Sequence, residues 1–366
     1  MELTANPRTP PIALAELPAD ELATRIAQCR DQLGSRVLVL GHHYQADDII
    51  VHADATGDSF RLAQLAAGSE APFIVFAGVH FMAESADVLT PERQTVILPD
   101  LRAGCSMADM AHVEDVESVW SELMDAETGR RVVPITYVNS SAALKAFVAR
   151  HGGAVCTSSN AAAVLRWAFD RADQVLFVPD QHLGRNVALD LGVPADGIRT
   201  LDIGYPRGGL TPDELRRTDV LLWCGHCSVH TAFLPAHVAH WRSEHPQARI
   251  IVHPECMHEV VTASDQHGST GAIIRAIEQA EPGSTWAVGT EMHLVQRLQA
   301  QMPDRTVKSL SPFPCLCSTM YRIRPAWLLW VLEELLAGRP QNVIRVPHDV
   351  AVQARVALRR MLDIPA

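Results

Sequence analysis

The feature that most constrains the fold of this chain is a pattern that occurs three times. Each occurrence opens on a short apolar run, passes a turn rich in Ser and Thr, and ends on a cysteine in a polar turn. The opening runs begin at Val37, Val133 and Ile250. The Ser/Thr turns are Gly57–Ser59, Thr157–Ser159 and Gly268–Thr270, and the closing cysteines are Cys105, Cys227 and Cys317. Such repetition predicts three similar units arranged with pseudo-threefold symmetry around one central site.

Between these landmarks the chain alternates short apolar runs with stretches of helical periodicity. The apolar runs predict strands at 37–41, 73–77, 95–98, 132–138, 174–178, 219–223, 249–253, 285–288 and 306–309. The periodic stretches predict helices at 60–67, 80–88, 141–149, 160–170, 184–191, 271–280 and 291–300. Strands that alternate with helices are typical of parallel sheets covered on both faces. The sequence therefore predicts an α/β fold of three pseudo-threefold-related, three-layer α/β/α domains with short parallel sheets.

The predicted domains follow the repeats. Residues 1–18 contain several prolines and no periodicity, which predicts a flexible lead-in. The α/β units are predicted at 19–106, 107–228 and 229–320. Residues 321–366 are predicted to form a C-terminal helical segment that packs on the core.

Charge and hydropathy exclude several classes of partner. The 31 basic residues are outnumbered by 42 acidic ones, and the net charge of −11 argues against binding to nucleic acid or to an anionic membrane. The longest apolar run, at 326–332, is too short to span a bilayer and is expected to be the buried face of a helix. No secretory signal is visible at the N-terminus. We therefore expect a cytoplasmic protein.

The eight cysteines lack the spacing of a disulfide framework. Cys29 and Cys156 lie in helical and strand patterns and are expected to have no chemical role. The pair Cys224 and Cys227 alone fits either a redox pair or half of a zinc site. One thiolate from each repeat would leave a coordination position open, as in an iron–sulfur cubane with one substrate-binding iron. Zinc and simple burial remain the alternatives at this point.

Polar residues follow the first strand of each repeat. The three pairs are His42 and Tyr44, Tyr137 and Asn139, and His253 and Glu255. Ligands of open parallel sheets bind at the C-terminal ends of the strands, where helix N-termini favour anions. The pattern therefore predicts a pocket for a molecule that carries carboxylate or phosphate groups.

Two details strengthen this prediction. Pro254 fixes the backbone between His253 and Glu255, which favours a pre-positioned acid/base or substrate-binding pair. Ser59, Ser158 and Thr270 are each expected to be the N-cap of the following helix. A capping hydroxyl lies where an anion would bind, so the two roles are compatible.

Ten short motifs, in order from about Val37 to about Leu336, together resemble the quinolinate synthase family. The first five are His-x-Tyr-Gln at 42–45, Gly-Asp-Ser at 57–59, Gly-Val-His-Phe-Met-Ala-Glu at 78–84, Ala-Gly-Cys-Ser-Met-Ala-Asp at 103–109 and Thr-Tyr-Val-Asn-Ser at 136–140. The others are Cys-Thr-Ser-Ser-Asn at 156–160, Gly-His-Cys-Ser-Val-His at 225–230, His-Pro-Glu-Cys at 253–256, Gly-Ser-Thr at 268–270 and Cys-Ser-Thr-Met at 317–320.

The resemblance implies an activity and a cofactor. Members of this family serve bacterial NAD biosynthesis. They condense iminoaspartate with dihydroxyacetone phosphate to quinolinate, with loss of phosphate and water. The reaction takes place at a 4Fe-4S cluster that three cysteines hold between three pseudo-symmetry-related α/β domains. The enzyme that oxidises aspartate to iminoaspartate is a candidate partner.

The resemblance also implies roles for single residues. The cluster ligands are Cys105, Cys227 and Cys317, and His230 lies beside the cluster. Cys317 is preferred over Cys315 because the ligand of this motif precedes Met by three positions. Proton transfer is assigned to Tyr44 and Glu255. The residues that bind substrate are His42, Ser59, Tyr137, Val138, Asn139, Ser158, His253, Pro254, Glu255 and Thr270.

Other functions stay open at the level of sequence. The alternatives are another iron–sulfur hydro-lyase that acts on a small dicarboxylate, and a cluster-bearing redox sensor. A sensor would need a surface for nucleic acid or a partner, which the acidic charge disfavours. The oligomeric state, the order of chemical steps and a redox role for Cys224 or Cys315 are likewise left open.

Overall fold

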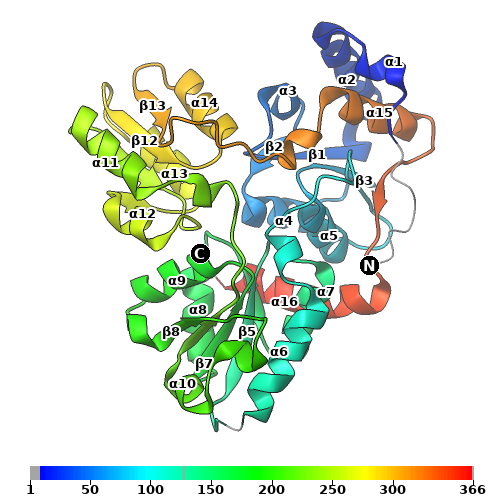
Figure 1. Ribbon diagram of the computed structural model, residues 1–366. Coiled ribbons are helices and arrows are strands. Elements are labelled where there is room, and N and C mark those ends of the chain that lie inside the picture. Colours follow the sequence, from blue (N-terminus) through cyan, green and yellow to red (C-terminus); the bar gives the residue numbers. More distant parts are fainter. Residues whose placement is uncertain (1–8, 127, 365–366) are drawn as a thin grey trace. The chain divides into compact units, whose positions relative to one another are not determined.

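The computed structural model (Figure 1) describes residues 9–126 and 128–364. These residues form two compact units. The first unit comprises the described residues up to Cys105 together with Leu316–Pro347. The second comprises Ser106–Cys315 and the described residues from His348 onward. Within the described ranges, none of the helices combines the length and the apolar character that a bilayer crossing requires.

The first unit contains one five-stranded sheet with the strand order β14-β4-β3-β1-β2. Its strands are β1 (Val37–His42), β2 (Ala55–Gly57), β3 (Phe73–Ala77), β4 (Thr95–Ile97) and β14 (Val343–Ile344). Neighbouring strands of this sheet are parallel, except that β14 pairs with β4 in antiparallel orientation. Its helices are α1 (Ile12–Ala15), α2 (Ala19–Leu33), α3 (Asp47–Ile50), α4 (Ser59–Ala67), α5 (His80–Leu89) and α15 (Pro325–Leu336), with 3₁₀ turns η1 (Gly34–Arg36) and η6 (Met320–Arg322). The apolar helix α15 packs against α2, as its composition predicts.

The second unit contains two parallel sheets. One has the order β6-β5-β7-β9-β8 and the other the order β11-β10-β12-β13. The strands are β5 (Val132–Tyr137), β6 (Ala154–Cys156), β7 (Gln174–Val178), β8 (Ile198–Thr200), β9 (Val220–Leu222), β10 (Arg249–Val252), β11 (Gln266–His267), β12 (Thr285–Gly289) and β13 (Thr306–Ser309).

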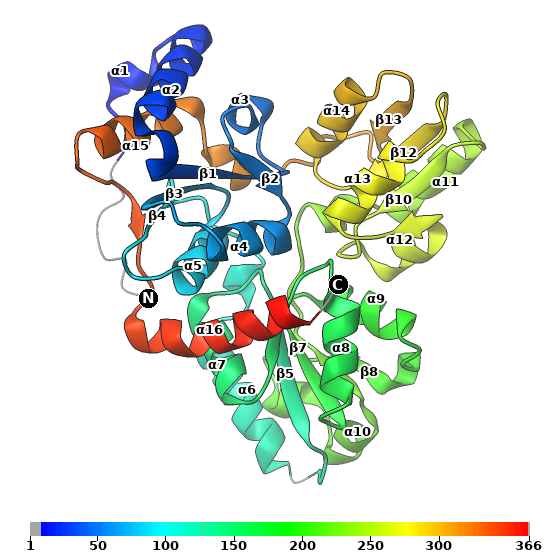
Figure 2. The same ribbon diagram turned by 180° about the vertical axis from the view of Figure 1, so that it is seen from behind.

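Helices flank both of these sheets. They are α6 (Val113–Asp125), α7 (Ala142–Arg150), α8 (Ala161–Phe169), α9 (Gln181–Asp190), α10 (Pro212–Arg217), α11 (Pro235–Glu244), α12 (His258–Ala263), α13 (Thr270–Glu278), α14 (Met292–Gln301) and α16 (His348–Asp363). Short 3₁₀ turns are η2 (Ala108–Met110), η3 (Ala195–Gly197), η4 (Pro206–Gly209) and η5 (His230–Ala232). Figure 2 shows α16 alongside α7, against which it packs.

The three sheets share one topology. In each, the second strand along the chain lies at one edge, beside the first, and the third lies on the other side of the first. These triplets are β2-β1-β3, β6-β5-β7 and β11-β10-β12. The predicted α/β class, with several short and mostly parallel sheets flanked by helices, is therefore confirmed. The boundaries of the three predicted domains stay a prediction.

Strand register confirms that the polar residues after the strands are equivalent. His42 pairs with Gly57, and Tyr137 pairs with Cys156. Ser59 and Ser158 each follow two residues after these partners. In the third sheet Val252 pairs with His267. This register places His253 opposite Gly268, and Thr270 follows two residues after Gly268. The topology therefore carries equivalent side chains to the C-terminal end of each sheet.

The prediction that Ser59, Ser158 and Thr270 are N-caps is wrong. The cap of α4 is Asp58, whose carboxylate accepts the N–H of Arg61 at 2.9 Å. The cap of α13 is Ser269, whose hydroxyl accepts the N–H of Ala272 at 3.3 Å. Helix α8 follows Asn160 without a side-chain cap. The cap position therefore lies one residue before the predicted one in α4 and α13 and two residues after it in α8, because there the backbone has the non-helical conformation that a cap requires.

Candidate active site

In the first unit, the predicted site residues include the turn after β1. His42 is buried, and its Nδ1 accepts the N–H of Tyr44 at 3.1 Å. The two rings meet edge to face with centroids 4.7 Å apart. Ser59 is half-buried at the start of α4. Because Nδ1 of His42 accepts a hydrogen bond, the neutral imidazole carries its proton on Nε2.

In the second unit, three predicted residues meet at Glu255. The hydroxyl of Tyr137 donates to Oε1 of Glu255 at 2.5 Å, and Nδ1 of His230 lies 2.7 Å from Oε2. The imidazole of His253 stacks on that of His230 with ring centroids 4.4 Å apart. Glu255 is only 3% exposed. A buried carboxylate is thus held by one donor on each oxygen.

Electrostatics keep Glu255 charged and His253 neutral. Burial alone would favour the protonated carboxyl group, but His253, His230 and the hydrogen bonds from His230 and Tyr137 outweigh it and lower the pKa of Glu255. Burial lowers the pKa of His253 to about 3, although the charge of Glu255 opposes this. The N–H of Glu255 also donates to Nδ1 of His253 at 3.3 Å, so the proton of that neutral ring is on Nε2.

The Cys227 thiol belongs to the same cluster of side chains. One ligand atom each of Cys227, His230 and Glu255 lies within 4.8 Å of the others. Across the described ranges, this is the one group of three or more metal-binding side chains that are this close together. His230 therefore lies close to the Cys227 thiol, and its role beside a cluster stays a prediction.

The remaining predicted residues of the second unit surround β5, β6 and β10. Val138 is buried, and its N–H donates to the carbonyl of Cys156 at 2.8 Å. Asn139 is half-buried, and its side-chain oxygen has no hydrogen-bond partner within the described part of the chain. Ser158 is half-buried, and Thr270 is buried at the start of α13. Of these four residues, Asn139 therefore has a side-chain oxygen that could accept a hydrogen bond from a ligand.

Cys105, Cys227 and Cys317 share one local structure. Each stands three residues before a 3₁₀ turn, namely η2, η5 and η6. The two intervening residues form a turn in every case. Thr231 donates its N–H to the Cys227 carbonyl at 3.0 Å, and Tyr321 donates likewise to Cys317 at 3.1 Å. All three cysteines are half-buried and outside any disulfide, so one backbone motif presents a thiol from each repeat.

The other cysteines differ in burial or in position. Cys29, Cys156 and Cys256 are buried, and burial raises the pKa of each thiol. Cys315 is buried, burial raises the pKa of its thiol, and the thiol contacts the Phe313 carbonyl at 3.6 Å. Cys224 is exposed but lies outside the turn. The contrast between Cys315 and Cys317 supports the choice of Cys317, because its thiol is only half-buried whereas that of Cys315 is buried.

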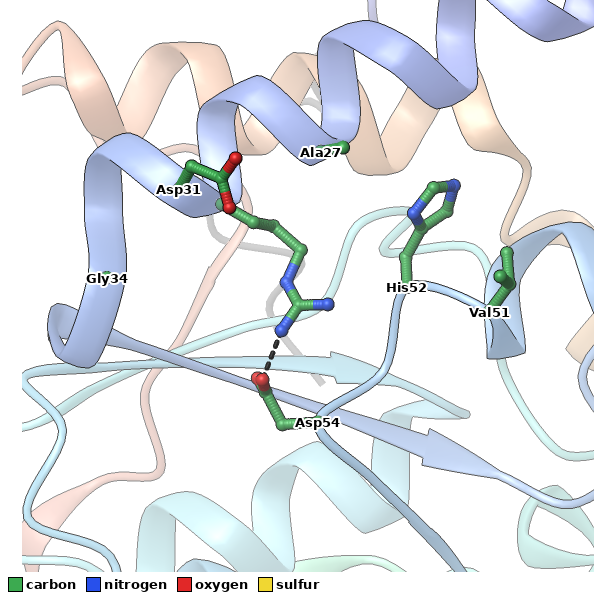
Figure 3. A pocket seen from close by; sticks show the side chains of 7 residues that line it. Ala27, Asp31, Gly34, Val51, His52 and Asp54 are labelled. Atoms are coloured by element: carbon green, nitrogen blue, oxygen red, sulfur yellow. Dashed lines mark hydrogen bonds and ion pairs between the residues drawn. The ribbon is translucent and has the colours of Figure 1, made fainter.

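A separate cavity of about 570 Å³ opens in the first unit between the end of α2 and the segment after α3 (Figure 3). Its lining residues are Ala27, Arg30, Asp31, Gly34, Val51, His52 and Asp54. Arg30 and Asp54 form an ion pair there. The cavity contains none of the predicted site residues.

Comparison with known proteins identifies the family. Residues 24–363 match the family model described as Quinolinate synthetase A protein. The chain belongs to this family. The quinolinate synthase of Herpetosiphon aurantiacus is 54% identical over 353 residues, which cover 96% of this chain and 94% of the relative. That of Corynebacterium glutamicum is 54% identical over 346 residues (94% and 88%), and that of Bacillus subtilis is 50% identical over 357 residues (97% and 96%).

The cysteine turns fit the iron–sulfur cluster that the family resemblance implies. Iron–sulfur clusters take thiolate ligands, and among the eight cysteines the three repeat cysteines combine the same turn with a partly accessible thiol. Three is also the number that leaves one iron of a cubane without a protein ligand. Cys227 adds a further match, because acid–base side chains lie within 4.8 Å of its thiol.

Two buried residues at the site were missed by the sequence analysis. Thr290 follows β12, and its hydroxyl lies 3.1 Å from Nε2 of His230. Asp180 follows β7 and caps α9, with one carboxylate oxygen that accepts two N–H groups and a second oxygen without a partner among the described residues. Burial and then the charge of Glu255 raise the pKa of Asp180 well above its usual value. Both residues follow the third strand of a repeat, whereas the sequence pattern pointed only to the first strand, the Ser/Thr turn and the closing cysteine of each repeat.

Proposed function

We propose that this chain is a quinolinate synthase that condenses iminoaspartate with dihydroxyacetone phosphate and releases phosphate and water. The single observation that carries this proposal is the buried Glu255 carboxylate, held by Tyr137 and His230 close to the Cys227 thiol. Formation of an aromatic pyridine ring requires protons to leave carbon, and a positioned carboxylate can accept them. Membership of the family supports the identity of the product.

Glu255 and Tyr44 are the proposed proton carriers. Glu255 stays ionised because two donors stabilise its charge, so it enters the reaction as a base. Substrate binding that displaces either donor would raise the pKa of Glu255 and make it a stronger base. Tyr44, beside the His42 ring, would supply a phenol that gives a proton and, as the phenolate, takes one back.

Substrate anions would bind at the C-terminal ends of the three sheets. The proposed binding residues are His42, Ser59, Tyr137, Val138, Asn139, Ser158, His253, Pro254, Glu255 and Thr270. Ser59 and Thr270 support this assignment because neither hydroxyl caps its helix. Both lie in the first turn of a helix, where N–H groups and the helix dipole favour a carboxylate or phosphate.

Cys105, Cys227 and Cys317 would hold a 4Fe-4S cluster. Such a cluster, when bound, supplies an iron that polarises a substrate hydroxyl or carboxylate as a Lewis acid. We further propose a cytoplasmic location, three α/β units around one site, and iminoaspartate delivery by an aspartate-oxidising enzyme.

The activity test uses protein purified without oxygen. The enzyme should convert dihydroxyacetone phosphate and freshly generated iminoaspartate to quinolinate, measured by chromatography. Activity should fall in air and return after anaerobic reconstitution with iron and sulfide, because an iron without a protein ligand is open to oxidants. Cluster-loaded protein that forms no quinolinate would contradict the proposal.

The ligand assignment has its own test, with iron content and the optical spectrum as measurements. Cys105→Ser, Cys227→Ser and Cys317→Ser should each lose iron and absorption near about 400 nm. Cys315→Ser and Cys29→Ser are the matched controls and should retain both. Full iron in Cys317→Ser together with loss in Cys315→Ser would move the third ligand to Cys315.

A further inference from the structure

Asn186 joins helix α9 to the turn that carries Glu255. Its side-chain NH₂ group donates to the carbonyl of Pro254 and to that of Cys256, each at 2.9 Å. Its side-chain oxygen lies 2.9 Å from Nδ1 of His258. Asn186 is only 2% exposed. Every hydrogen-bonding function of this buried amide is therefore directed to residues 254–258.

These contacts determine how the amide is oriented. Carbonyl oxygens only accept hydrogen bonds, so the NH₂ group must face Pro254 and Cys256. The amide oxygen then faces His258, whose Nδ1 must carry a proton. Within the described chain, neither carbonyl has another donor. Removal of the Asn186 amide would leave two buried backbone acceptors unsatisfied, which is energetically unfavourable.

The two carbonyls flank Glu255 on either side. Inside the turn, Cys256 donates its N–H to the His253 carbonyl at 3.0 Å, and His253 donates to the Gly289 carbonyl at 3.0 Å. Together with the bond from the N–H of Glu255 to Nδ1 of His253, these bonds hold the N–H groups of the turn, but they leave the carbonyls of Pro254 and Cys256 without a partner inside it. Asn186 holds these two carbonyls from α9, a helix that packs on the neighbouring sheet of the second unit.

We propose that Asn186 is a positioning residue, which holds the backbone of Glu255 so that its carboxylate stays between Tyr137 and His230. This inference rests on the proposed function, in which Glu255 transfers protons. Asn186 contacts the carbonyls and His258 and acts through the turn. A displacement of about 1 Å in a catalytic group can reduce the rate by about 10²-fold, so loss of the restraint should act on turnover.

The first test is kinetic and uses the anaerobically purified holoenzyme. Asn186→Ala and Asn186→Asp should reduce kcat by about 10- to 10²-fold with KM values for both substrates near the wild-type values. Asn186→Asp keeps the size of the side chain but offers at most one donor for two carbonyls, so it serves if the alanine variant does not fold. Val187→Ala, a buried truncation on the same helix, is the matched control and should retain kcat.

The second test is a double-mutant cycle with Glu255→Gln. If Asn186 acts through Glu255, Asn186→Ala should cause little further loss of kcat in the Glu255→Gln enzyme. Additive losses would overturn the inference, since a general structural defect lowers turnover in either background. Normal kcat in both Asn186 variants, with kcat still low in Glu255→Gln, would overturn the inference and leave the proposed function intact. Normal kcat in Glu255→Gln itself would remove the proton-transfer role on which the inference rests.

Discussion

The turns 42–45 and 253–256 occupy the same place in two different sheets, yet they present different chemistry. In each, the fourth residue donates its N–H to the histidine carbonyl, at 2.9 Å in the first turn and 3.0 Å in the second. In each, the third residue donates its N–H to Nδ1 of the histidine, at 3.1 Å and 3.3 Å. One backbone template therefore presents an imidazole and a second polar side chain two residues later.

The difference lies in the third residue and in what surrounds it. Tyr44 is a half-buried phenol against the ring of its own histidine. Glu255 is a buried carboxylate that binds Tyr137 and His230, which lie 118 and 25 residues away in the chain. The two sheets thus share the backbone conformation of this turn, while hydrogen bonds from distant segments stabilise the charge of Glu255. This comparison predicts a stronger dependence of turnover on Glu255 than on Tyr44.

The largest effect is expected for Glu255→Gln, which keeps the shape of the side chain and removes its charge. Turnover should fall by about 10²- to 10⁴-fold, because that is the usual contribution of a positioned acid–base group. The cluster spectrum and substrate binding should persist. Glu259→Gln, an exposed neighbour on α12, is the control in steady-state kinetics. Near-normal turnover in Glu255→Gln would leave Tyr44 as the candidate proton carrier.

Tyr44→Phe should reduce turnover by about 10²-fold, the lower end of the range for general acid–base groups. A neutral phenol is a weaker base than a carboxylate, which is the physical reason for the smaller loss. The exposed Tyr205 provides a matched Tyr→Phe control. A larger loss in Tyr44→Phe than in Glu255→Gln would reverse the roles of the two turns.

The hydroxyl groups of Ser59 and Thr270 should affect the binding of substrate. Ser59→Ala and Thr270→Ala each remove a hydroxyl that would bond a charged substrate, worth about 1.5–3 kcal/mol, or roughly ten- to hundredfold in affinity. We expect higher KM values in both. Thr270→Ser keeps the hydroxyl and should retain wild-type kinetics. Unchanged KM values in the two alanine variants would make these residues ordinary first-turn positions.

Tyr137→Phe tests the environment of Glu255 through pH. The variant loses a donor that stabilises the carboxylate, so the pKa of Glu255 should rise. Since the base form then disappears at a higher pH, the acidic limb of the kcat/KM profile should shift to higher pH. An unshifted limb would show that the Tyr137 bond does not control the ionisation of Glu255.

The last prediction concerns stability and not turnover, and it belongs to His253. Its pKa falls from 6.5 to about 3 on folding, so between these values the unfolded chain binds one more proton than the folded chain. The free energy of unfolding should therefore decrease as pH falls through this window, by at most about 1.4 kcal/mol per pH unit. Urea unfolding of iron-free protein measures the slope. His253→Gln should flatten it, and an equal slope in the variant would contradict neutral burial of His253.

Much of the fold could be predicted from local pattern. All of the predicted strands and helices are present, because buried parallel strands have continuous apolar sequences. The strands that escaped prediction are β2, β6, β8, β11 and β14, each of two or three residues. Such segments are too short to show periodicity, and pairing with a neighbour is what makes them strands. The caps were misplaced by one or two residues, because Ser, Asp and Asn compete for the same position.

For the candidate site, too, some features follow from the sequence and others only from the tertiary structure. The sequence by itself determined which side chains follow the C-terminal ends of the strands and that each repeat ends on one cysteine in a polar turn, since periodicity and turn composition are local properties. Only the tertiary structure decided that Glu255 is a buried charge between Tyr137 and His230, that Cys315 is desolvated while Cys317 is half-buried, and that Asn186 holds the turn. Burial and hydrogen bonds between distant segments control ionisation, and no local pattern encodes them.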